Sequence, residues 1–190
     1  MNSFSKLCEE SFTRVCSIKI MCYNFFSLGS KNQHTIYEDL SHQLTMQKVE
    51  IFTDGACRGN PGPGGYGSII RTNGQENELS GSAERTTNNI MELTAAVAAL
   101  KQLTEPSEVV LTSDSQYLVK GMTQWIKGWI KKNWTTSAKQ PVKNKDIWIE
   151  LERLSKIHKI SWKWVRGHQG HAENERCDLL ANMAVDKMNS

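Results

Sequence analysis

Two short runs of apolar and β-branched residues each lead into an aspartate, and they constrain the fold more than any other feature of the chain. The first run is KVEIFTD, which ends in Asp54, and the second is SEVVLTSD, which ends in Asp114. Runs of this length and composition are typical of buried strands. In open α/β sheets, functional groups gather at the carboxyl ends of neighbouring strands. We therefore expect the two carboxylates to meet at one edge of a sheet.

The order of the remaining elements favours an α/β fold that begins with antiparallel strands. Segments 48–53, 65–72 and 77–84 have the composition of three successive strands, joined by a Gly/Pro-rich loop and the turn TNGQ. The later strands are 107–114 and 159–167, and the helical segments are 86–103, 115–133, 144–157 and 172–188. Thr86 or Thr87 can cap the first helix, and Gly121 is expected to break 115–133 into two short helices. This order predicts a mixed sheet with helices packed on it.

The first 45 residues differ from the rest of the chain. They hold three of the five cysteines and show no sustained helical or strand period, whereas the regular pattern starts next to Met46. We expect residues 1–45 to form a disordered or weakly structured extension, and residues 46–190 to form one folded domain. A targeting or partner-binding segment is the alternative for residues 1–45, and Met46 is an alternative start of the natural product.

The cysteine count and the hydropathy pattern predict a cytoplasmic protein that does not contact a membrane. Five cysteines are an odd number, and none belongs to a C-x-x-C pair, which is typical of a reduced, intracellular protein. The longest apolar run, 15–28, is interrupted by Lys19 and Asn24. Neither a membrane span nor a cleaved secretory signal is therefore expected.

Two further acids lie on helices, where they can join the two strand-end aspartates. Glu92 lies beside the apolar stripe of the first long helix, and Asp178 has a similar place in the last one. A single acid in such a position is usually a solvated carboxylate. Four together would repel one another unless cations compensate, and sets of oxygen ligands suit Mg²⁺. Because two such ions can stabilise the attacking and leaving oxygens of a phosphodiester, the acids favour a two-metal nuclease.

The glycine-rich stretch GACRGNPGPGGYG, which follows the first strand, matches neither common type of nucleotide-binding loop. It lacks the Gly-Lys-Ser/Thr ending of a P-loop and the spacing of a dinucleotide fingerprint, and no helical pattern follows it. Its glycines allow either a tight connection between antiparallel strands or a close approach of the backbone to a ligand.

Six motifs, in this order along the chain, resemble those of the bacterial type 1 ribonuclease H family. They are IFTDGACRGNPGPGGYG, ERTTNNIMEL, TSDSQYL, QWIKGWIKKNW, PVKNKDIW and WVRGHQGHAENERCDLLA, and the resemblance covers residues 46–187. It implies a ribonuclease H-like fold with a five-stranded mixed sheet, three antiparallel strands followed by parallel ones, flanked by helices. It also implies an endonuclease that hydrolyses the RNA strand of RNA–DNA hybrids. Such an enzyme uses two Mg²⁺ ions, for which Mn²⁺ can substitute, and leaves 5′-phosphate and 3′-hydroxyl ends.

The resemblance assigns the residues of the expected active site. The family's four acidic metal ligands match Asp54, Glu92, Asp114 and Asp178. Because none of them is replaced, we expect an active enzyme. His168 matches a family histidine on a mobile loop that assists proton movement or product departure, and the glycines on both sides of it would permit such motion. The alternatives for His168 are a solvated loop histidine and a zinc site with His171 and Cys177, whose spacing fits no usual structural pattern.

The resemblance also assigns contacts to the two strands of a hybrid. The residues expected to read the RNA strand through its 2′-hydroxyl groups are Cys57, Asn60, Asn88, Asn89 and Gln116. The residues expected to form a phosphate pocket for the DNA strand are Arg85, Thr87 and Asn144. Arg85 and Thr87 stand at the start of a helix, where backbone amides and the helix dipole favour an anion. Ile90 replaces a residue that is often basic in the family, so one phosphate contact is expected to be lost.

A lysine-rich segment, 125–145, is expected to bind the DNA strand. It contains six lysines and no acid. Trp125 and Trp129 are four residues apart and share one helix face, a spacing that is more often found in a core. The match to the family's basic protrusion favours instead that these rings contact the strand while the lysines neutralise phosphates. Trp148, Trp162 and Trp164 are expected in the core or at its edge.

Two other functions are weighed against hybrid cleavage. A hybrid-binding protein without catalytic activity is disfavoured because all four acids are present. A DNA-cutting enzyme of the same broad fold is disfavoured by the residues that match readers of the 2′-hydroxyl group. The chain shows no second nucleic-acid-binding domain, and we expect a monomer.

Overall fold

The computed structural model describes residues 46–167 and 169–188. The chain divides into two units, residues 1–45 and residues 46–190, and the second unit is considered by itself below. The predictions for residues 1–45 and for His168 lie outside the described residues.

A five-stranded mixed sheet forms the centre of the folded unit, as predicted. Its strands are β1 (Gln47–Cys57), β2 (Gly62–Thr72), β3 (Gln75–Thr86), β4 (Ser107–Ser113) and β5 (Lys159–Trp164), in the spatial order β3-β2-β1-β4-β5. β1, β2 and β3 pair antiparallel, whereas β4 pairs in parallel with β1 and β5 in parallel with β4. The two parallel pairs align the carboxyl ends of three strands at one edge of the sheet.

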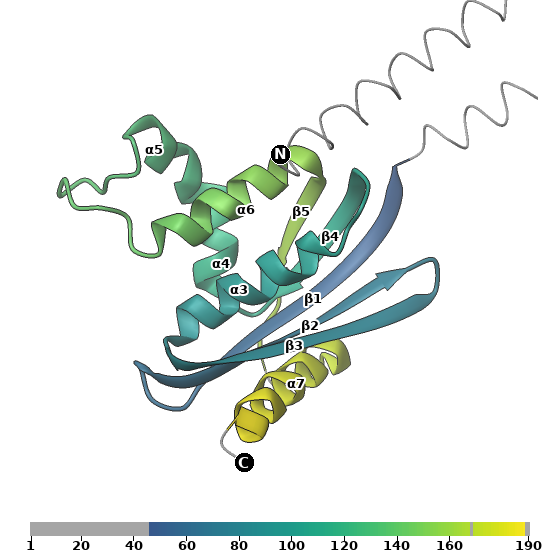
Figure 1. Cartoon of the computed structure of the whole chain (residues 1–190). Coiled ribbons are helices and arrows are strands. Elements are labelled where there is room, and N and C mark those ends of the chain that lie inside the picture. The colour runs from purple at the N-terminus through teal and green to yellow at the C-terminus, as the bar shows by residue number, and fades with distance from the viewer. Residues whose placement is uncertain (1–45, 168, 189–190) are drawn as a thin grey trace, which may run out of the picture. The chain divides into compact units, whose positions relative to one another are not determined.

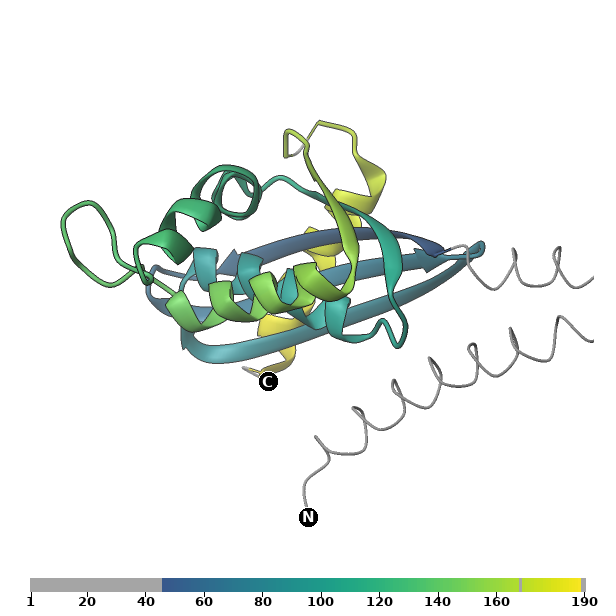
Figure 2. The same ribbon diagram turned by 90° about the horizontal axis from the view of Figure 1, so that it is seen from above.

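Helices cover both faces of this sheet (Figures 1 and 2). On one face α3 (Asn88–Lys101) packs against β1 and β2, with α6 (Lys145–Ile157) beside it. On the other face α7 (Ala172–Met188) packs against β1, β2 and β3. The side of the sheet that bears α7 is left uncovered over part of β4, where the Val110 side chain is 39% exposed.

Alternation along β1 and β2 separates a large core from a small one. Val49 and Ile51 face the larger cluster, which includes Leu93 of α3 and Trp148 of α6. The neighbouring Phe52 faces a smaller cluster, which it forms with Ile69 and Cys177. Successive side chains of a strand point to opposite faces, so one strand supplies both cores.

The chain after β4 stays helical from Gln116 to Lys131, within the predicted segment 115–133. α4 (Gln116–Lys120) continues through one π-helical turn, η1 (Gly121–Trp125), into α5 (Ile126–Lys131). The two predicted short helices are present as α4 and α5, and α4 ends next to Gly121, but the chain does not leave the helical conformation there, because Gly121 keeps right-handed helical dihedral angles. Its lack of a side chain serves packing instead, since a Cβ atom there would overlap the Trp148 ring. Beyond α5 the chain projects away from the sheet as a loop before α6 begins (Figure 1).

Candidate active site

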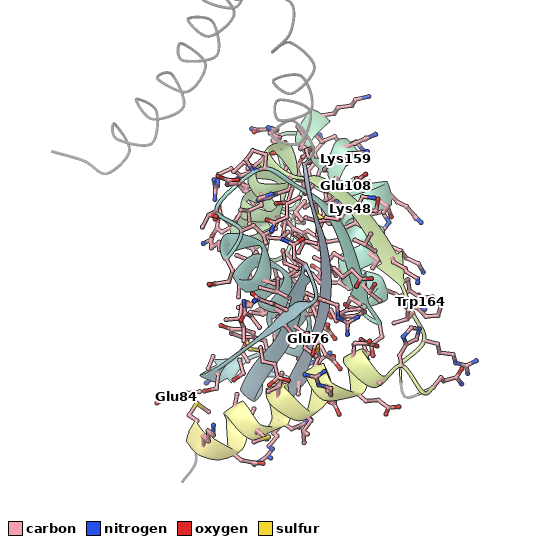
Figure 3. The ribbon with its side chains drawn as sticks, turned by 90° about the vertical axis from the view of Figure 1, so that its right-hand side faces the viewer. Lys48, Glu76, Glu84, Glu108, Lys159 and Trp164 are labelled. Atoms are coloured by element: carbon pink, nitrogen blue, oxygen red, sulfur yellow. The ribbon has the colours of Figure 1, made fainter. Side chains whose placement is uncertain are left out.

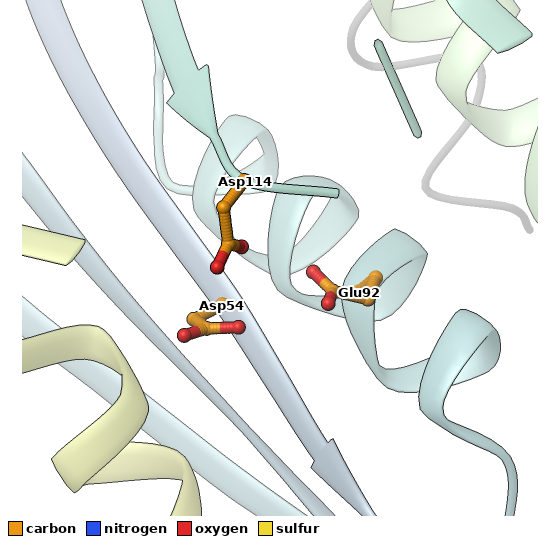
Figure 4. A group of neighbouring side chains, drawn as sticks. All are labelled: Asp54, Glu92 and Asp114. Carbon is orange, nitrogen blue, oxygen red and sulfur yellow. The ribbon is translucent and has the colours of Figure 1, made fainter. Parts of the chain in front are cut away.

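Three carboxylates from distant parts of the sequence meet beside the sheet. Asp54 lies on β1, Glu92 on α3, and Asp114 directly after β4, and their side chains point toward one another (Figure 4). One oxygen atom from each lies within 4.8 Å of the others. The meeting of Asp54 and Asp114 agrees with the expectation from their strands, and Glu92 joins them from the helix above.

Asp54 is positioned by β1, although it does not end that strand as the sequence suggests. β1 continues to Cys57 because its antiparallel pairing with β2 continues to Cys57 and Gly64. Its parallel pairing with β4 stops at Thr53 and Ser113, so the two strands diverge where Asp54 and Asp114 follow. The Gly55 backbone N–H donates a 2.7 Å hydrogen bond to Asp54 Oδ1 and fixes the orientation of the carboxylate.

Glu92 is positioned by a close approach of α3 to β1. Thr87 caps the helix, and its side chain accepts a hydrogen bond from the Ile90 N–H. A Cβ atom on Gly55 would overlap the backbone nitrogen of Glu92, so only glycine lets the helix lie this close to the strand. Asn88, one turn earlier, donates a 3.3 Å hydrogen bond from Nδ2 to Glu92 Oε1. Glu92 is thereby buried, with 5% of its surface exposed.

Asp114 is positioned by hydrogen bonds from the end of β5. The indole Nε1 of Trp164 donates to the backbone oxygen of Asp114 at 3.0 Å, and the Val165 N–H donates to the Ser113 oxygen at 3.1 Å. The prediction that Trp164 lies in or beside the core is wrong. Trp164 is the last residue of β5, its side chain is 44% exposed, and it lies near the start of the chain that leads to α7 (Figure 3).

Burial and mutual repulsion keep protons on this site. Burial is the largest cause that raises the pKa of Asp54 to about 7, and the negative charge of Asp114 adds to it. Burial likewise raises the pKa of Glu92 well above its usual range, with further contributions from Asp54 and Asp114. Both effects disfavour the charged carboxylate. The site is therefore strained electrostatically at neutral pH unless a cation neutralises it.

The three carboxylates fit a divalent cation. Glu92 Oε2 and Asp114 Oδ1 are buried and have no hydrogen-bond partner among the described residues. Buried polar atoms without partners are rare and point to an unfilled requirement for a ligand. Carboxylate oxygens are the ligands that Mg²⁺ prefers. The cluster can therefore hold such an ion, in agreement with the prediction of a metal-dependent site.

Asp178, the fourth predicted ligand, lies outside the close group. It is half-buried on α7, and its Oδ1 accepts a 2.9 Å hydrogen bond from Asn182, one turn further along. Its negative charge nevertheless contributes to the raised pKa values of both Asp54 and Glu92. Cys177, a member of the zinc alternative, is buried in the smaller core, and His168, its predicted partner, lies outside the described residues, so this alternative stays a prediction.

The predicted contacts for nucleic acid lie on exposed or half-buried surface. Exposed residues of this set are Asn60, Arg85, Asn88 and Gln116, and half-buried ones are Cys57, Thr87, Asn89 and Asn144. Several of these residues also form hydrogen bonds within the protein. Cys57 donates its thiol hydrogen to the Gly59 oxygen at 2.7 Å, and Gln116 Oε1 accepts from Lys120 at 2.7 Å. None of these contacts removes the residues from the surface.

The two tryptophans of the lysine-rich segment have different environments. Trp125 is 36% exposed and is available to a ligand. Trp129 is half-buried and packs against the main core, with its ring centroid 5.3 Å from that of Trp148. The alternative that tryptophans at this spacing belong to the core is therefore correct in part for Trp129. The rings of Trp125 and Trp129 also contact each other, with their centroids 5.8 Å apart.

Tyr117 contacts residues of two regions that are predicted to bind the DNA strand, a connection that its sequence position did not predict. Its hydroxyl accepts hydrogen bonds from Trp148 Nε1 at 3.2 Å and Asn144 Nδ2 at 3.4 Å. Its ring lies 5.2 Å from that of Trp148 and 6.2 Å from that of Trp125. Tyr117 thus connects the proposed phosphate pocket with the lysine-rich segment. The only signal in the sequence was its place next to Gln116 in the motif TSDSQYL.

Sequence comparison identifies close relatives over the whole folded unit. The family model described as RNase H matches residues 46–186. A protein named Ribonuclease H from Pelobacter propionicus is 60% identical over 144 residues, which are 76% of this chain and 88% of that protein. A Ribonuclease H from Geotalea uraniireducens is 63% identical over 139 residues, which are 73% of this chain and 95% of that protein.

Solved structures share the fold. LC9-RNase H1, a type 1 RNase H, is 32% identical with a TM-score of 0.69, over 76% of this chain and 74% of that one. LC11-RNase H1, solved in complex with an RNA/DNA hybrid, is 28% identical with a TM-score of 0.57, over 75% of this chain and 99% of that one.

Proposed function

The chain belongs to the ribonuclease H family and is a nuclease, and from that premise we propose that it hydrolyses the RNA strand of RNA–DNA hybrids by two-metal-ion catalysis. The products would carry 5′-phosphate and 3′-hydroxyl ends. The observation that carries the proposal is the buried group of Asp54, Glu92 and Asp114, whose oxygens lie within 4.8 Å of one another. Support for the substrate comes from LC11-RNase H1, whose structure contains an RNA/DNA hybrid.

The metal ions would be held by the four carboxylates, with Asp54, Glu92 and Asp114 at the centre and Asp178 at the side. When bound, two Mg²⁺ ions supply an activated water and stabilise the charge that develops on the attacked phosphate. Hydrogen bonds within the protein orient two of these carboxylates. The Gly55 N–H orients Asp54, and Asn88 orients Glu92. The hydrogen bond from Asn182 occupies Oδ1 of Asp178 and leaves Oδ2 available to a metal ion.

The surface beside the carboxylates would distinguish the two strands of the hybrid. Residues proposed to contact the RNA strand are Cys57, Asn60, Asn88, Asn89 and Gln116, and those proposed for the DNA strand are Arg85, Thr87, Asn144, Trp125 and Trp129. The 2′-hydroxyl group, accessible in the shallow minor groove, is the mark that separates RNA from DNA. His168 is proposed to assist proton movement or product departure.

A cleavage assay with defined strands tests this function. A 5′-labelled RNA strand is annealed to DNA and incubated with the protein, with and without Mg²⁺, and the all-DNA and all-RNA duplexes serve as controls. We expect metal-dependent cuts in the hybrid alone. A ligase should rejoin the products, because ligation requires the expected 5′-phosphate and 3′-hydroxyl ends. Asp54→Asn should abolish cleavage and retain hybrid binding. Binding without turnover in the wild-type protein, or cleavage of the all-DNA duplex, would reject the proposal.

We also propose that the protein acts in the cytoplasm as a monomer. Among the described residues, Cys57 and Cys177 are free thiols, as a reducing compartment requires. Within residues 46–167 and 169–188, no helix has the length and hydropathy needed to cross a bilayer. Gel filtration with light scattering tests the oligomeric state, and a dimer mass at micromolar concentration would contradict this proposal.

A further inference from the structure

We propose that Gly167 is a positioning residue for the carboxylate of Asp114. Gly167 lies in the chain between β5 and α7, immediately against the Asp114 side chain. Without a side chain of its own, it leaves Asp114 the room to turn toward Asp54 and Glu92. This inference rests on the proposed metal-dependent function, because its effect is on a metal ligand.

A side chain at position 167 would meet a single neighbouring side chain, that of Asp114. A Cβ atom at position 167 would overlap Asp114 Oδ2 and would lie 3.3 Å from Asp114 Cγ and 3.5 Å from its Cβ. These three atoms are the nearest neighbours of that position, and none belongs to the backbone. A methyl group at residue 167 would therefore be accommodated by rotation of the Asp114 carboxylate and not by a shift of a strand. We expect the fold to survive and the ligand to move.

The surrounding chain leaves little alternative to that rotation. The Trp164 indole holds the backbone oxygen of Asp114, and the Val165 N–H holds the oxygen of Ser113. Trp164 is also aligned with Ser113 in the parallel pairing of β5 with β4. The segment that carries Gly167 is thus tied to the segment that carries Asp114, so the two backbones cannot separate without losing these contacts.

The two glycines that flank residue 168 have different roles. Gly170 has a φ of +79° and open space where a side chain would be, so it is required for its backbone conformation. Gly167 is not among the glycines with positive φ. Any residue could adopt its backbone conformation, and the requirement for glycine comes from the contact with Asp114. Both glycines were expected to permit motion of the loop, whereas the structure gives them different roles.

The test compares Gly167→Ala with Gly170→Ala. Circular dichroism and thermal unfolding first establish that both variants are folded. Mg²⁺ binding is then measured by isothermal titration calorimetry without nucleic acid, and the Mg²⁺ concentration for half-maximal hybrid cleavage is measured separately. Substitutions that disturb the orientation of a metal ligand typically weaken metal binding by about 10- to 100-fold. We expect that loss for Gly167→Ala, with kcat recovering at high Mg²⁺, and no comparable loss for Gly170→Ala.

A crystal structure of metal-free Gly167→Ala gives a readout that does not depend on metal binding. We expect the Asp114 carboxylate to have left the group that it forms with Asp54 and Glu92. An unchanged carboxylate, or equal Mg²⁺ affinity of the wild type and Gly167→Ala, overturns the positioning role and leaves the proposed function intact. A folded wild-type protein that neither binds Mg²⁺ nor cleaves the hybrid overturns the proposed function, and this inference with it. Equal losses in both glycine variants would indicate a hinge instead.

Discussion

Replacing Asp54 by asparagine should stabilise the metal-free protein at pH 8, although it destroys the proposed catalytic site. The substitution removes a negative charge from a residue that is only 6% exposed. It keeps the size of the side chain and the oxygen that accepts the hydrogen bond from the Gly55 N–H. The new amide group can donate to the neighbouring carboxylates, which the aspartate repels. The variant therefore avoids the free-energy cost of burying a charge and keeps the other interactions of the side chain.

The magnitude follows from the pKa of Asp54, which burial and Asp114 raise from 3.8 to about 7. The native protein then binds a proton more tightly than the unfolded chain, so the stability contributed by this proton is complete below pH 4 and is lost as the pH rises toward 7. At about 1.4 kcal/mol per pH unit, the full loss is roughly 4 kcal/mol at pH 8 and roughly 1.5 kcal/mol at pH 5. For a domain of this size, 1 kcal/mol corresponds to about 2–4 °C in Tm.

Thermal unfolding in the presence of a chelator, at pH 5 and at pH 8, measures this difference. We expect the Tm of Asp54→Asn to exceed that of the wild type by about 8–16 °C at pH 8 and by about 3–6 °C at pH 5. Asp146→Asn is the matched control, since Asp146 is an exposed acid in the first turn of α6 and its replacement should change stability by less than about 1 kcal/mol. A lower Tm for Asp54→Asn at pH 8, or an equal gain at both pH values, would show that burial and repulsion do not govern this site.

Three further predictions concern the metal and the nucleic-acid surface. Mg²⁺ at 100 times its dissociation constant should raise the stability of the wild type by about 2.7 kcal/mol but not that of Asp54→Asn, as a thermal shift assay at pH 8 would show. Tyr117→Phe, which leaves Trp148 Nε1 without its partner, should cost about 1–3 kcal/mol in denaturant unfolding and weaken hybrid binding, and an unchanged affinity would detach Tyr117 from the phosphate pocket. Lys131→Ala should reduce the slope of log affinity against log salt concentration for hybrid binding by about 1. Trp125→Ala should weaken hybrid binding, as measured by fluorescence anisotropy. Lys156 forms an ion pair with Glu152 on α6, and Lys156→Ala should change neither the affinity nor this slope.

The sheet and the meeting of the acids were predictable because they depend on strong local patterns. Runs of β-branched and apolar residues mark the buried strands, and their order along the chain predicted a mixed sheet, whose five-stranded arrangement the family resemblance implied. The meeting of Asp54 and Asp114 follows from parallel pairing of β1 with β4, which stops immediately before both residues. The position of Glu92 beside the apolar stripe of its helix already placed it with the other acids, and the family resemblance then matched it to a metal ligand.

The features that were missed depend on packing between elements. Gly121 keeps helical dihedral angles and leaves room for the Trp148 ring, which would overlap a side chain there, and no local pattern encodes that contact. Trp164 is exposed as the last residue of β5, which is an edge strand of the sheet, so its apolar character alone was misleading. Tyr117 is important through partners 27 and 31 residues away in the sequence. A single sequence gives propensities along the chain, whereas these contacts arise only in three dimensions.

The cluster formed by Tyr117, Trp125, Trp129 and Trp148 bears on protein engineering. The lysine-rich segment cannot be transferred to another protein by itself, because two of the four aromatic rings that pack together, Tyr117 on α4 and Trp148 on α6, lie outside it. A graft onto a scaffold that lacks these two rings would keep the positive charge of the segment but not its orientation. Adding Tyr117 and Trp148 to the transferred parts should restore the packing that orients the segment.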